Sequence, residues 1–547
     1  MASANGLVCF TNCLLPQEDG SLVEMDLWMD ERRGVILDAQ VRLDRTPIVI
    51  VSLLTFAHEY TACQKTFFLR KERPDKIVDL GGKILSPGFI DIQINGGYGF
   101  DFSVYDGDDE TYRNGLKLVA ERIIETGVTA LVPTIITQER TLYPKILHLL
   151  RPWSPPGAAH LLGWHAEGPF LHLAKRGAHS PPLIMPAFEG FKTFESTYGP
   201  ENMADAEDWL MASDSDQDAV GVRMITGAPE VDGVMEGITE ASKRGICFNI
   251  GHSVCTTDIA TAAIRNGARC ITHLFNAMPQ LHHRDPSIIG LLGFSPYLTS
   301  PPASTYAPFP APTVAALKLA MTSGSGTPKK TASPTPYASE AFDEIQTPPQ
   351  TPVLLATQSR AQAHKRPLLT STAAITPMPL ESRQSNKSGK SIATLPPFER
   401  PFYEIIVDGI HSHPNSVRLA YSAHPDGCIL ITDAMKILDP HLKDGIHEWR
   451  DGRRFYKEGD KLYLEGTTTL AGSVITMDKC VRNFTRFTGC SVGEAIKCAT
   501  FNPARCLGLE HKKGTLRPGA DADLVVLDGD GEVYSTWVRG KMVWEKQ

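Results

Sequence analysis

The sequence predicts an α/β fold, a closed TIM-like (β/α)8 barrel with a small β-sandwich domain formed from the N- and C-terminal segments. Three observations predict this fold. From Pro87 onward, short apolar segments alternate with stretches of helical spacing. Both ends of the chain instead alternate polar and apolar residues, as half-buried strands do. Between Gly251 and Arg284, two short apolar runs flank a helical stretch, which together make one βαβ unit.

Length, composition and charge limit the classes of protein to consider. The chain has 547 residues, enough for one large barrel and a satellite domain. A net charge of -8 gives no basic surface, so we expect no nucleic-acid partner. The longest apolar run, Ile48 to Phe56, is too short to span a bilayer, so we expect no membrane segment. The 11 cysteines include no CxxC pair, which favours reduced thiols and a cytoplasmic protein.

The two ends of the chain are expected to pair into one small β domain. Residues 1–86 supply its first part and residues 506–547 its second. The segment Val41 to Gln64 interrupts the first part with an apolar run that lacks a clear partner. It is either an irregular loop or extra strand, or a retained intron of the gene model, because Val codons begin with GT and Gln can be CAG. Spliced message that still encodes this segment would exclude the intron.

The barrel is expected in two parts, residues 87–295 and 402–505, with helices such as Asp109–Gly127 and Pro414–His424 between the strands. The expected strands are Gly88–Asn95, Val128–Thr134, Leu161–Glu167, Val220–Thr226, Ile246–Gly251, Arg269–His273, Glu404–Gly409 and Cys428–Asp433. Residues 296–401 interrupt the alternation with a Pro-, Ser- and Thr-rich stretch of low apolar content. We expect a disordered insertion, whose Thr-Pro and Ser-Pro steps are either phosphorylation sites or part of an unselected linker.

Polar side chains recur where the expected strands end, which is where (β/α)8 barrels carry their chemistry. Glu167, His252 and His273 follow three of these strands. A carboxylate with two imidazoles is a typical donor set for catalytic zinc, although a single histidine in this position is more often a hydrogen-bonded core residue. A bound metal lowers the pKa of water from near 16 toward about 7. Asp433, after an apolar strand, is the expected general base, with a simple helix or loop cap as the alternative.

A second group of residues is suited to an anionic substrate. It comprises His179, His283, Arg284, His411 and the turn Asn276–Met278. Arginine binds phosphate through two parallel hydrogen bonds, and histidines and backbone N–H groups add donors. Residues of these types near turns are also common on solvated surfaces.

Ten ordered motifs resemble the N-acetylglucosamine-6-phosphate deacetylase family of the amidohydrolase superfamily, nearly end to end outside the two interruptions. The motifs are PGFIDIQINGG (87–97), HAEGPF (165–170), KRGAHSP (175–181), GHS (251–253), THLFNAM (272–278), HRDPSIIG (283–290), VDGIH (407–411), ITDA (431–434), LAGS (470–473), and NPAR (502–505) with GTLRPGADADLVVLD (514–528).

The resemblance implies a fold and a set of roles. It implies a TIM-like barrel with a β-sandwich from both ends, and deacetylation of N-acetylglucosamine 6-phosphate to glucosamine 6-phosphate and acetate in amino-sugar catabolism. Zinc would be held by Glu167, His252 and His273, with Asp433 as the general base that then protonates the leaving amine. His179 would polarise the acetamide carbonyl. The sugar phosphate would be held by Asn276, Ala277, Arg284 and His411, with the arginine supplied across the interface of a homodimer.

One departure from the wider superfamily bears on the metal. Many amidohydrolases carry HxH after the first strand and bind two metals, whereas this chain has Gln93 and Asn95 there. Amide side chains are poor zinc ligands, so we expect one tight metal, with Gln93 and Asn95 in a supporting role or at a second, weak site. Such sites accept zinc, iron, cobalt or manganese according to supply, so the native metal stays open.

Two other functions compete with this reading. A different amidohydrolase would act on a cyclic amide or a deacetylated amino acid and would not need Arg284 for a phosphate. A catalytically silent relative would use its long insertion as a regulated binding protein, although Glu167, His252, His273 and Asp433 are all present. For the first alternative the test is Arg284→Ala, which should raise KM strongly for a 6-phosphorylated sugar and hardly matter for a neutral one. For the second, metal analysis with a deacetylation assay on purified protein decides.

Overall fold

The computed structural model describes residues 5–40, 73–203, 221–294, 399–448, 454–467 and 472–547. Two predicted features fall outside these ranges. The doubtful segment Val41 to Gln64 lies wholly outside them, and so does nearly all of the Pro-, Ser- and Thr-rich stretch 296–401. The predictions of a retained intron and of a disordered insertion therefore stay predictions.

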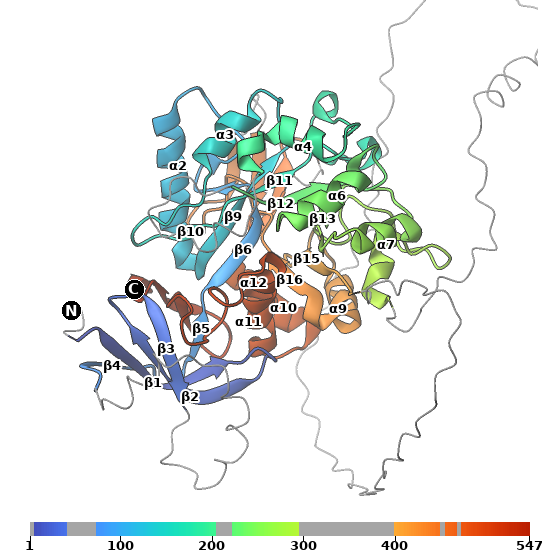
Figure 1. Ribbon diagram of the computed structural model, residues 1–547. Helices are drawn as coiled ribbons and strands as arrows, with labels where there is room; N and C mark the ends of the chain where they lie inside the picture. The colour runs from blue at the N-terminus through green and yellow to red at the C-terminus, as the bar shows by residue number, and fades with distance from the viewer. Residues whose placement is uncertain (1–4, 41–72, 204–220, 295–398, 449–453, 468–471) are drawn as a thin grey trace, which may run out of the picture. The chain divides into compact units, whose positions relative to one another are not determined.

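Eight parallel strands form the predicted barrel (Figure 1), paired in the order β6-β9-β11-β12-β13-β14-β15-β16. The first and last strands close the ring: Asp433 N donates to Gln93 O at 2.9 Å, and Asn95 N donates to Ala434 O at 2.8 Å. Each expected strand overlaps an observed one. The strands are β6 (Phe89–Ile94), β9 (Val128–Ile136), β11 (Trp164–Glu167), β12 (Val222–Gly227), β13 (Cys247–Ile250), β14 (Cys270–Ile271), β15 (Phe402–Ile406) and β16 (Cys428–Ile431), with the short β10 (His160–Leu161) beside β9.

Helices connect the strands and pack on the outside of the barrel. Helix α2 (Asp109–Arg122) begins where the Asp108 carboxylate accepts hydrogen bonds from two backbone N–H groups, and it buries Tyr112, Leu116 and Val119 on one face. The other helices of the described residues are α3 (Tyr143–Leu149), α4 (Phe191–Tyr198), α6 (Val234–Lys243), α7 (Thr257–Arg265), α9 (Pro414–Ala423), α10 (Met477–Thr488), α11 (Val492–Ala499) and α12 (Phe501–Leu507). The 3₁₀ turns are η2 (Ile123–Thr126), η3 (Leu173–Lys175), η4 (Pro181–Leu183), η5 (Pro200–Asn202), η6 (Ser287–Gly293) and η7 (Pro425–Gly427). Within the described ranges, no helix combines the length and apolar content needed to cross a bilayer.

The two chain ends form one eight-stranded sheet, as predicted, in the order β22-β21-β20-β5-β1-β2-β3 with β4 beside β1 (Figure 1). The ends join where β20 pairs antiparallel with β5. Backbone hydrogen bonds between Ile36 of β3 and residues 519 and 520 fold the sheet back on itself around an apolar core. The strands are β1 (Leu7–Pro16), β2 (Leu22–Asp30), β3 (Val35–Gln40), β4 (Lys76–Asp79), β5 (Ile84–Pro87), β20 (Leu524–Leu527), β21 (Val533–Val538) and β22 (Lys541–Glu545).

Two small sheets were not predicted. A three-stranded antiparallel sheet, β17-β18-β19, lies in the connection that follows β16, and a two-stranded ribbon, β7-β8, follows β6. In β18, buried and exposed residues alternate, with Phe455 fully buried. The strands are β17 (Gly445–Glu448), β18 (Arg454–Glu458), β19 (Lys461–Leu464), β7 (Gly96–Gly97) and β8 (Phe100–Asp101).

In strand β16, successive residues belong to different apolar clusters. In β16, Leu430 packs into the large cluster shared with the outer helices, whereas Ile429 and Ile431 belong to a second cluster with Ala504 of α12. Asp433 has the same parity as Ile429 and Ile431. In β16 the strand period of two therefore separates Leu430, which packs into the cluster shared with the outer helices, from the positions that lead to Asp433.

A buried lysine joins the C-terminal segment to β10. The Lys513 ammonium lies 2.7 Å from the Asp521 carboxylate, 2.6 Å from that of Asp523 and 3.0 Å from Nδ1 of His160. Burial alone would lower the pKa of Lys513, but the carboxylates of Asp523 and Asp521 outweigh burial and raise it. The lysine therefore stays charged. Its ammonium lies against the carboxylates and the imidazole that could otherwise bind a metal ion, and it supplies the positive charge at that point.

Replacing Lys513 by methionine is expected to destabilise the protein by about 3–5 kcal/mol, because it leaves two buried carboxylates without their cation. Urea unfolding followed by fluorescence measures the change as a lower midpoint concentration. The matched control is Lys512→Met, one residue away on a partly exposed side chain. An equal midpoint for the two variants would contradict the expectation.

Candidate metal centre

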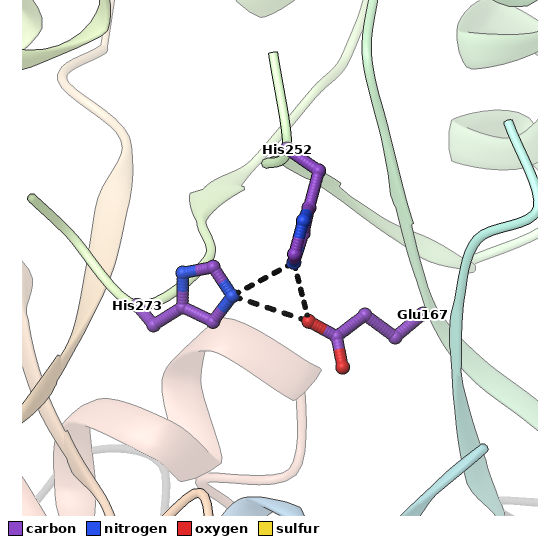
Figure 2. A group of neighbouring side chains, drawn as sticks. All are labelled: Glu167, His252 and His273. Carbon is purple, nitrogen blue, oxygen red and sulfur yellow. Dashed lines mark hydrogen bonds and ion pairs between the residues drawn. The ribbon is translucent and has the colours of Figure 1, made fainter. Parts of the chain in front are cut away.

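Glu167, His252 and His273 converge on one point at the carboxyl ends of three barrel strands (Figure 2). Nε2 of His252 lies 2.9 Å from Oε1 of Glu167, and Nε2 of His273 lies 3.2 Å from the same oxygen. The two Nε2 atoms are 3.0 Å apart. Bonds of about 2.1 Å in tetrahedral geometry would place three zinc ligands roughly 3.4 Å apart. The three donor atoms are therefore arranged for one small cation.

Hydrogen bonding on the far side of His252 supports this arrangement. Its Nδ1 lies 2.7 Å from the carbonyl oxygen of Lys175, which can only accept, so Nδ1 carries the proton. The unprotonated Nε2 then faces the carboxylate oxygen of Glu167. Outer hydrogen bonds of this kind orient metal-binding histidines. The residues present therefore fit a divalent metal.

The charges of the cluster are coupled. Burial would raise the pKa of Glu167, but its close contacts with the imidazoles of His252 and His273 outweigh burial and hold that pKa well below its ordinary value. Burial would lower the pKa of His273, yet the Glu167 carboxylate raises it to about 9. The carboxylate is thus ionised and attracts positive charge to this point.

The backbone is unusual at the strand ends that carry the site. His252, His273 and Asp433 have positive φ angles of 49°, 27° and 46°. Non-glycine residues in this region cost about 1–3 kcal/mol each and persist where surrounding contacts hold them, often at functional sites. Here the backbone leaves the extended conformation two residues after each strand ends.

Asp433 is joined to the cluster through amide groups. Nδ2 of Asn95 donates to Oδ1 of Asp433 at 2.7 Å. Nε2 of Gln93 lies 3.4 Å from that same oxygen and 3.4 Å from Oε1 of Glu167. Burial, assisted by the charge of Glu167, raises the pKa of Asp433 to about 6. A carboxyl group of this kind can accept a proton near neutral pH and release it again.

His179 also reaches the cluster. Its Nδ1 accepts a hydrogen bond from the backbone N–H of Thr137 at 3.2 Å and lies 2.8 Å from the Thr137 hydroxyl. Nδ1 is therefore the acceptor, so the proton of the neutral ring is on Nε2, which lies 4.0 Å from Oε1 of Glu167. His179 thus presents a donor N–H beside the candidate metal ligands.

The predicted substrate-binding residues fall into two groups. His411 is largely buried, and its Nδ1 lies 2.5 Å from the Asp408 carboxylate. Burial would lower the pKa of His411, but Asp408 outweighs it and raises that pKa, with a contribution from Asp433. Arg284 and His283 are exposed, in the loop that follows β14.

Asn276 and Ala277 lie at the start of that loop. The Asn276 amide contacts the carbonyl oxygen of His273 at 3.3 Å, and Ala277 has a positive φ of 51°. The carbonyl oxygen of Ala277 accepts a hydrogen bond from Ser253 N at 3.2 Å. These two predicted residues therefore lie next to the candidate metal ligands in the chain and in space.

Two residues that sequence reasoning missed support the site from the remaining strand ends. Thr137 follows β9 and sets the protonation of His179. Glu230 follows β12; its carboxylate accepts hydrogen bonds from the Ser253 hydroxyl at 2.7 Å and from Val254 N at 2.6 Å, directly after His252. A search of the sequence for polar residues just after β9 and β12 would have found both Thr137 and Glu230.

Comparison with protein families and curated proteins gives one consistent result. A family model described as the amidohydrolase family matches residues 385–543. The N-acetylglucosamine-6-phosphate deacetylase of Danio rerio is 35% identical over 88% of this chain and 90% of its own length. The protein of the same name from Homo sapiens is 34% identical over 98% and 95%, and that from Bacillus subtilis is 28% identical over 84% and 85%.

Solved structures of similar fold carry the same name. The N-acetyl-D-glucosamine-6-phosphate deacetylase of Mycobacterium smegmatis has a TM-score of 0.60 at 21% identity and covers 98% of this chain and 100% of its own. The Thermotoga maritima protein has a TM-score of 0.58 at 21% identity, over 98% of this chain and 100% of its own. At these identities the structures show the shared fold.

Proposed function

The chain belongs to the N-acetylglucosamine-6-phosphate deacetylase family of amidohydrolases, and from this premise we propose that it hydrolyses N-acetyl-D-glucosamine 6-phosphate to D-glucosamine 6-phosphate and acetate, in amino-sugar catabolism. One observation carries the proposal: the convergence of Glu167, His252 and His273 on one point, with Asp433 linked to them through Gln93. The presence of all four groups in a chain of this family supports the proposal.

The metal ligands in this proposal are Glu167, His252 and His273. Two imidazoles and one carboxylate favour zinc, with iron, cobalt or manganese as alternatives that elemental analysis distinguishes. When bound, the metal supplies Lewis acidity that lowers the pKa of water and polarises the acetyl carbonyl. Gln93 and Asn95 then act as hydrogen-bond donors to Asp433 rather than as ligands.

The protein's own residues move the protons. Asp433 accepts a proton from the attacking water as the oxygen adds to the acetyl carbon, and the Nε2–H of His179 donates to the carbonyl oxygen, on which negative charge develops. Asp433 then returns the proton to the sugar nitrogen as the C–N bond breaks. Thr137 keeps His179 in the protonation state that this step requires.

The assay that tests the proposal measures acetate released from N-acetylglucosamine 6-phosphate and from its unphosphorylated analogue by purified, metal-analysed protein. Fast release from the phosphosugar is expected. Release from neither compound would exclude the function and favour a silent relative, and a preference for the unphosphorylated analogue would favour another amidohydrolase.

The phosphate is expected to contact Asn276, Ala277, Arg284 and His411, and we propose that Arg284 acts across the interface of a homodimer. Its exposed side chain, beside the exposed Leu281, supports such a role. Light scattering after size exclusion measures the oligomeric state. A cytoplasmic location is part of the proposal and is supported by the ten cysteines that the described residues contain as free thiols, nine of them buried.

Replacing Arg284 by alanine is expected to raise KM for the phosphosugar roughly 10- to 100-fold, because a hydrogen-bonded charge pair contributes about 1.5–3 kcal/mol. KM for the unphosphorylated analogue should change little. Steady-state kinetics on both substrates provide the measurement. Equal increases for the two substrates would show that Arg284 does not bind the phosphate.

A further inference from the structure

We propose that Asp285 is a positioning residue for recognition of the 6-phosphate, because its carboxylate fastens the loop that carries Arg284 to the segment that follows the metal ligand His252. One oxygen, Oδ1, accepts hydrogen bonds from Thr257 N at 2.9 Å, from the Thr257 hydroxyl at 2.6 Å and from Ser287 N at 3.1 Å. The inference rests on the proposed function and extends it to a residue outside the expected substrate contacts.

The loop is fastened at both ends to the same short segment, residues 253–257. At its start, the carbonyl oxygen of Ala277 accepts from Ser253 N at 3.2 Å. At its end, the Ser287 hydroxyl donates to the carbonyl oxygen of Cys255 at 2.6 Å, close to the Asp285 contacts. Between these anchors, residues 280–284 are all exposed. The base of the loop is thus fixed to the segment that follows His252, and its tip projects.

The negative charge of Asp285 is compensated where it lies. Thr257 is the first residue of helix α7, so its N–H group belongs to the positive end of the helix dipole. Burial would raise the pKa of Asp285, but the hydrogen bonds from Thr257 outweigh burial and lower it. Asp285 can therefore remain ionised next to Arg284, because three donors are directed at its Oδ1. Since those donors compensate its negative charge, Asp285 repels a bound phosphate less than an uncompensated carboxylate would.

Anchoring matters because Arg284 has a long, flexible side chain. Ordering such a side chain and its loop at the moment of binding weakens affinity, and a loop fixed in advance avoids most of that loss. In the proposed function Arg284 contacts only the phosphate of the substrate, so loosening the anchor should weaken recognition of the phosphorylated substrate selectively. A merely structural role for Asp285 would affect both substrates alike.

The test compares Asp285→Ala, Asp285→Asn and Asp258→Ala in the full-length protein. Asp258 is an exposed acid in the first turn of α7, so its removal is the matched loss of charge. For Asp285→Ala we expect KM for N-acetylglucosamine 6-phosphate to rise about tenfold. The ratio of kcat/KM between the phosphorylated and unphosphorylated substrates should fall by a similar factor. Asp285→Asn, whose amide oxygen can still accept from Thr257, should recover most of the loss, and Asp258→Ala should match the wild type.

Loss of activity on both substrates in equal proportion, or no change on either, would overturn the inference. If Asp285→Ala does not fold, Thr257→Val removes the 2.6 Å hydroxyl contact and carries the same test. A rise in KM of about threefold for the phosphosugar alone supports the inference, and an unselective change overturns it. Failure of the wild type to release acetate, or of Arg284→Ala to alter the preference for phosphate, would instead count against the proposed function.

Discussion

Replacement of Asp433 by asparagine is expected to lower kcat for deacetylation by a factor of roughly 10² to 10⁴, the range that general acid–base catalysis contributes. The amide cannot accept the proton of the attacking water and cannot deliver it to the leaving nitrogen. The fold should survive, because burial already raises the pKa of Asp433 to about 6 and a neutral side chain is easier to bury than a carboxylate. The amide oxygen can also keep the hydrogen bond from Asn95.

Three measurements on one preparation check this expectation: acetate release, metal content and the thermal unfolding midpoint. Only the first should change. The exposed Asp258→Asn variant is the matched control for loss of a carboxylate. Near-normal turnover in Asp433→Asn would remove Asp433 from the proton transfer, and loss of metal together with activity would assign it a different role.

Replacement of His252 by asparagine is expected to weaken metal binding by more than roughly a hundredfold and to abolish activity at low free metal. Changing an outer partner of a metal ligand already costs about 10- to 100-fold in affinity, so loss of the ligand itself should cost more. The variant would also leave Oε1 of Glu167 without its 2.9 Å partner. Excess metal should restore part of the activity if the remaining ligands stay in place.

Elemental analysis after dialysis against buffered free zinc gives the metal content per chain. The control is His148→Asn, an exposed histidine on α3. The wild type and the control should each hold one metal per chain. A His252→Asn variant that retains one metal per chain under the same conditions would show that the cation is held elsewhere.

Much of the fold follows from local patterns in the sequence. Buried parallel strands are short apolar runs, and each expected run contains or overlaps an observed strand, from Phe89–Ile94 to Cys428–Ile431. Helix α7 begins at Thr257 with Thr256 as its cap, within the expected helical stretch. The small sheet β17-β18-β19 was missed although β18 alternates buried and exposed residues, because the whole stretch 402–505 was assigned to the barrel.

The convergence of the candidate metal ligands was predictable because these residues end strands. Glu167, His252 and His273 each follow an apolar run, and parallel strands bring such positions to one end of the barrel. Thr137, Glu230 and Asp285 act through contacts with residues far along the chain, such as Thr137 with His179. No local pattern marks those contacts, so they appear only once the chain is folded.

Pairing of β20 with β5 has a consequence for biosynthesis. Strand β5 is made early and leads directly into the barrel, whereas Leu524–Leu527, its antiparallel partner, leaves the ribosome only after the last barrel strand. Until then one edge of the sheet has unsatisfied backbone groups, which can pair with other chains. A premature stop before Leu524 would therefore be expected to yield aggregation-prone polypeptides rather than a shorter working enzyme.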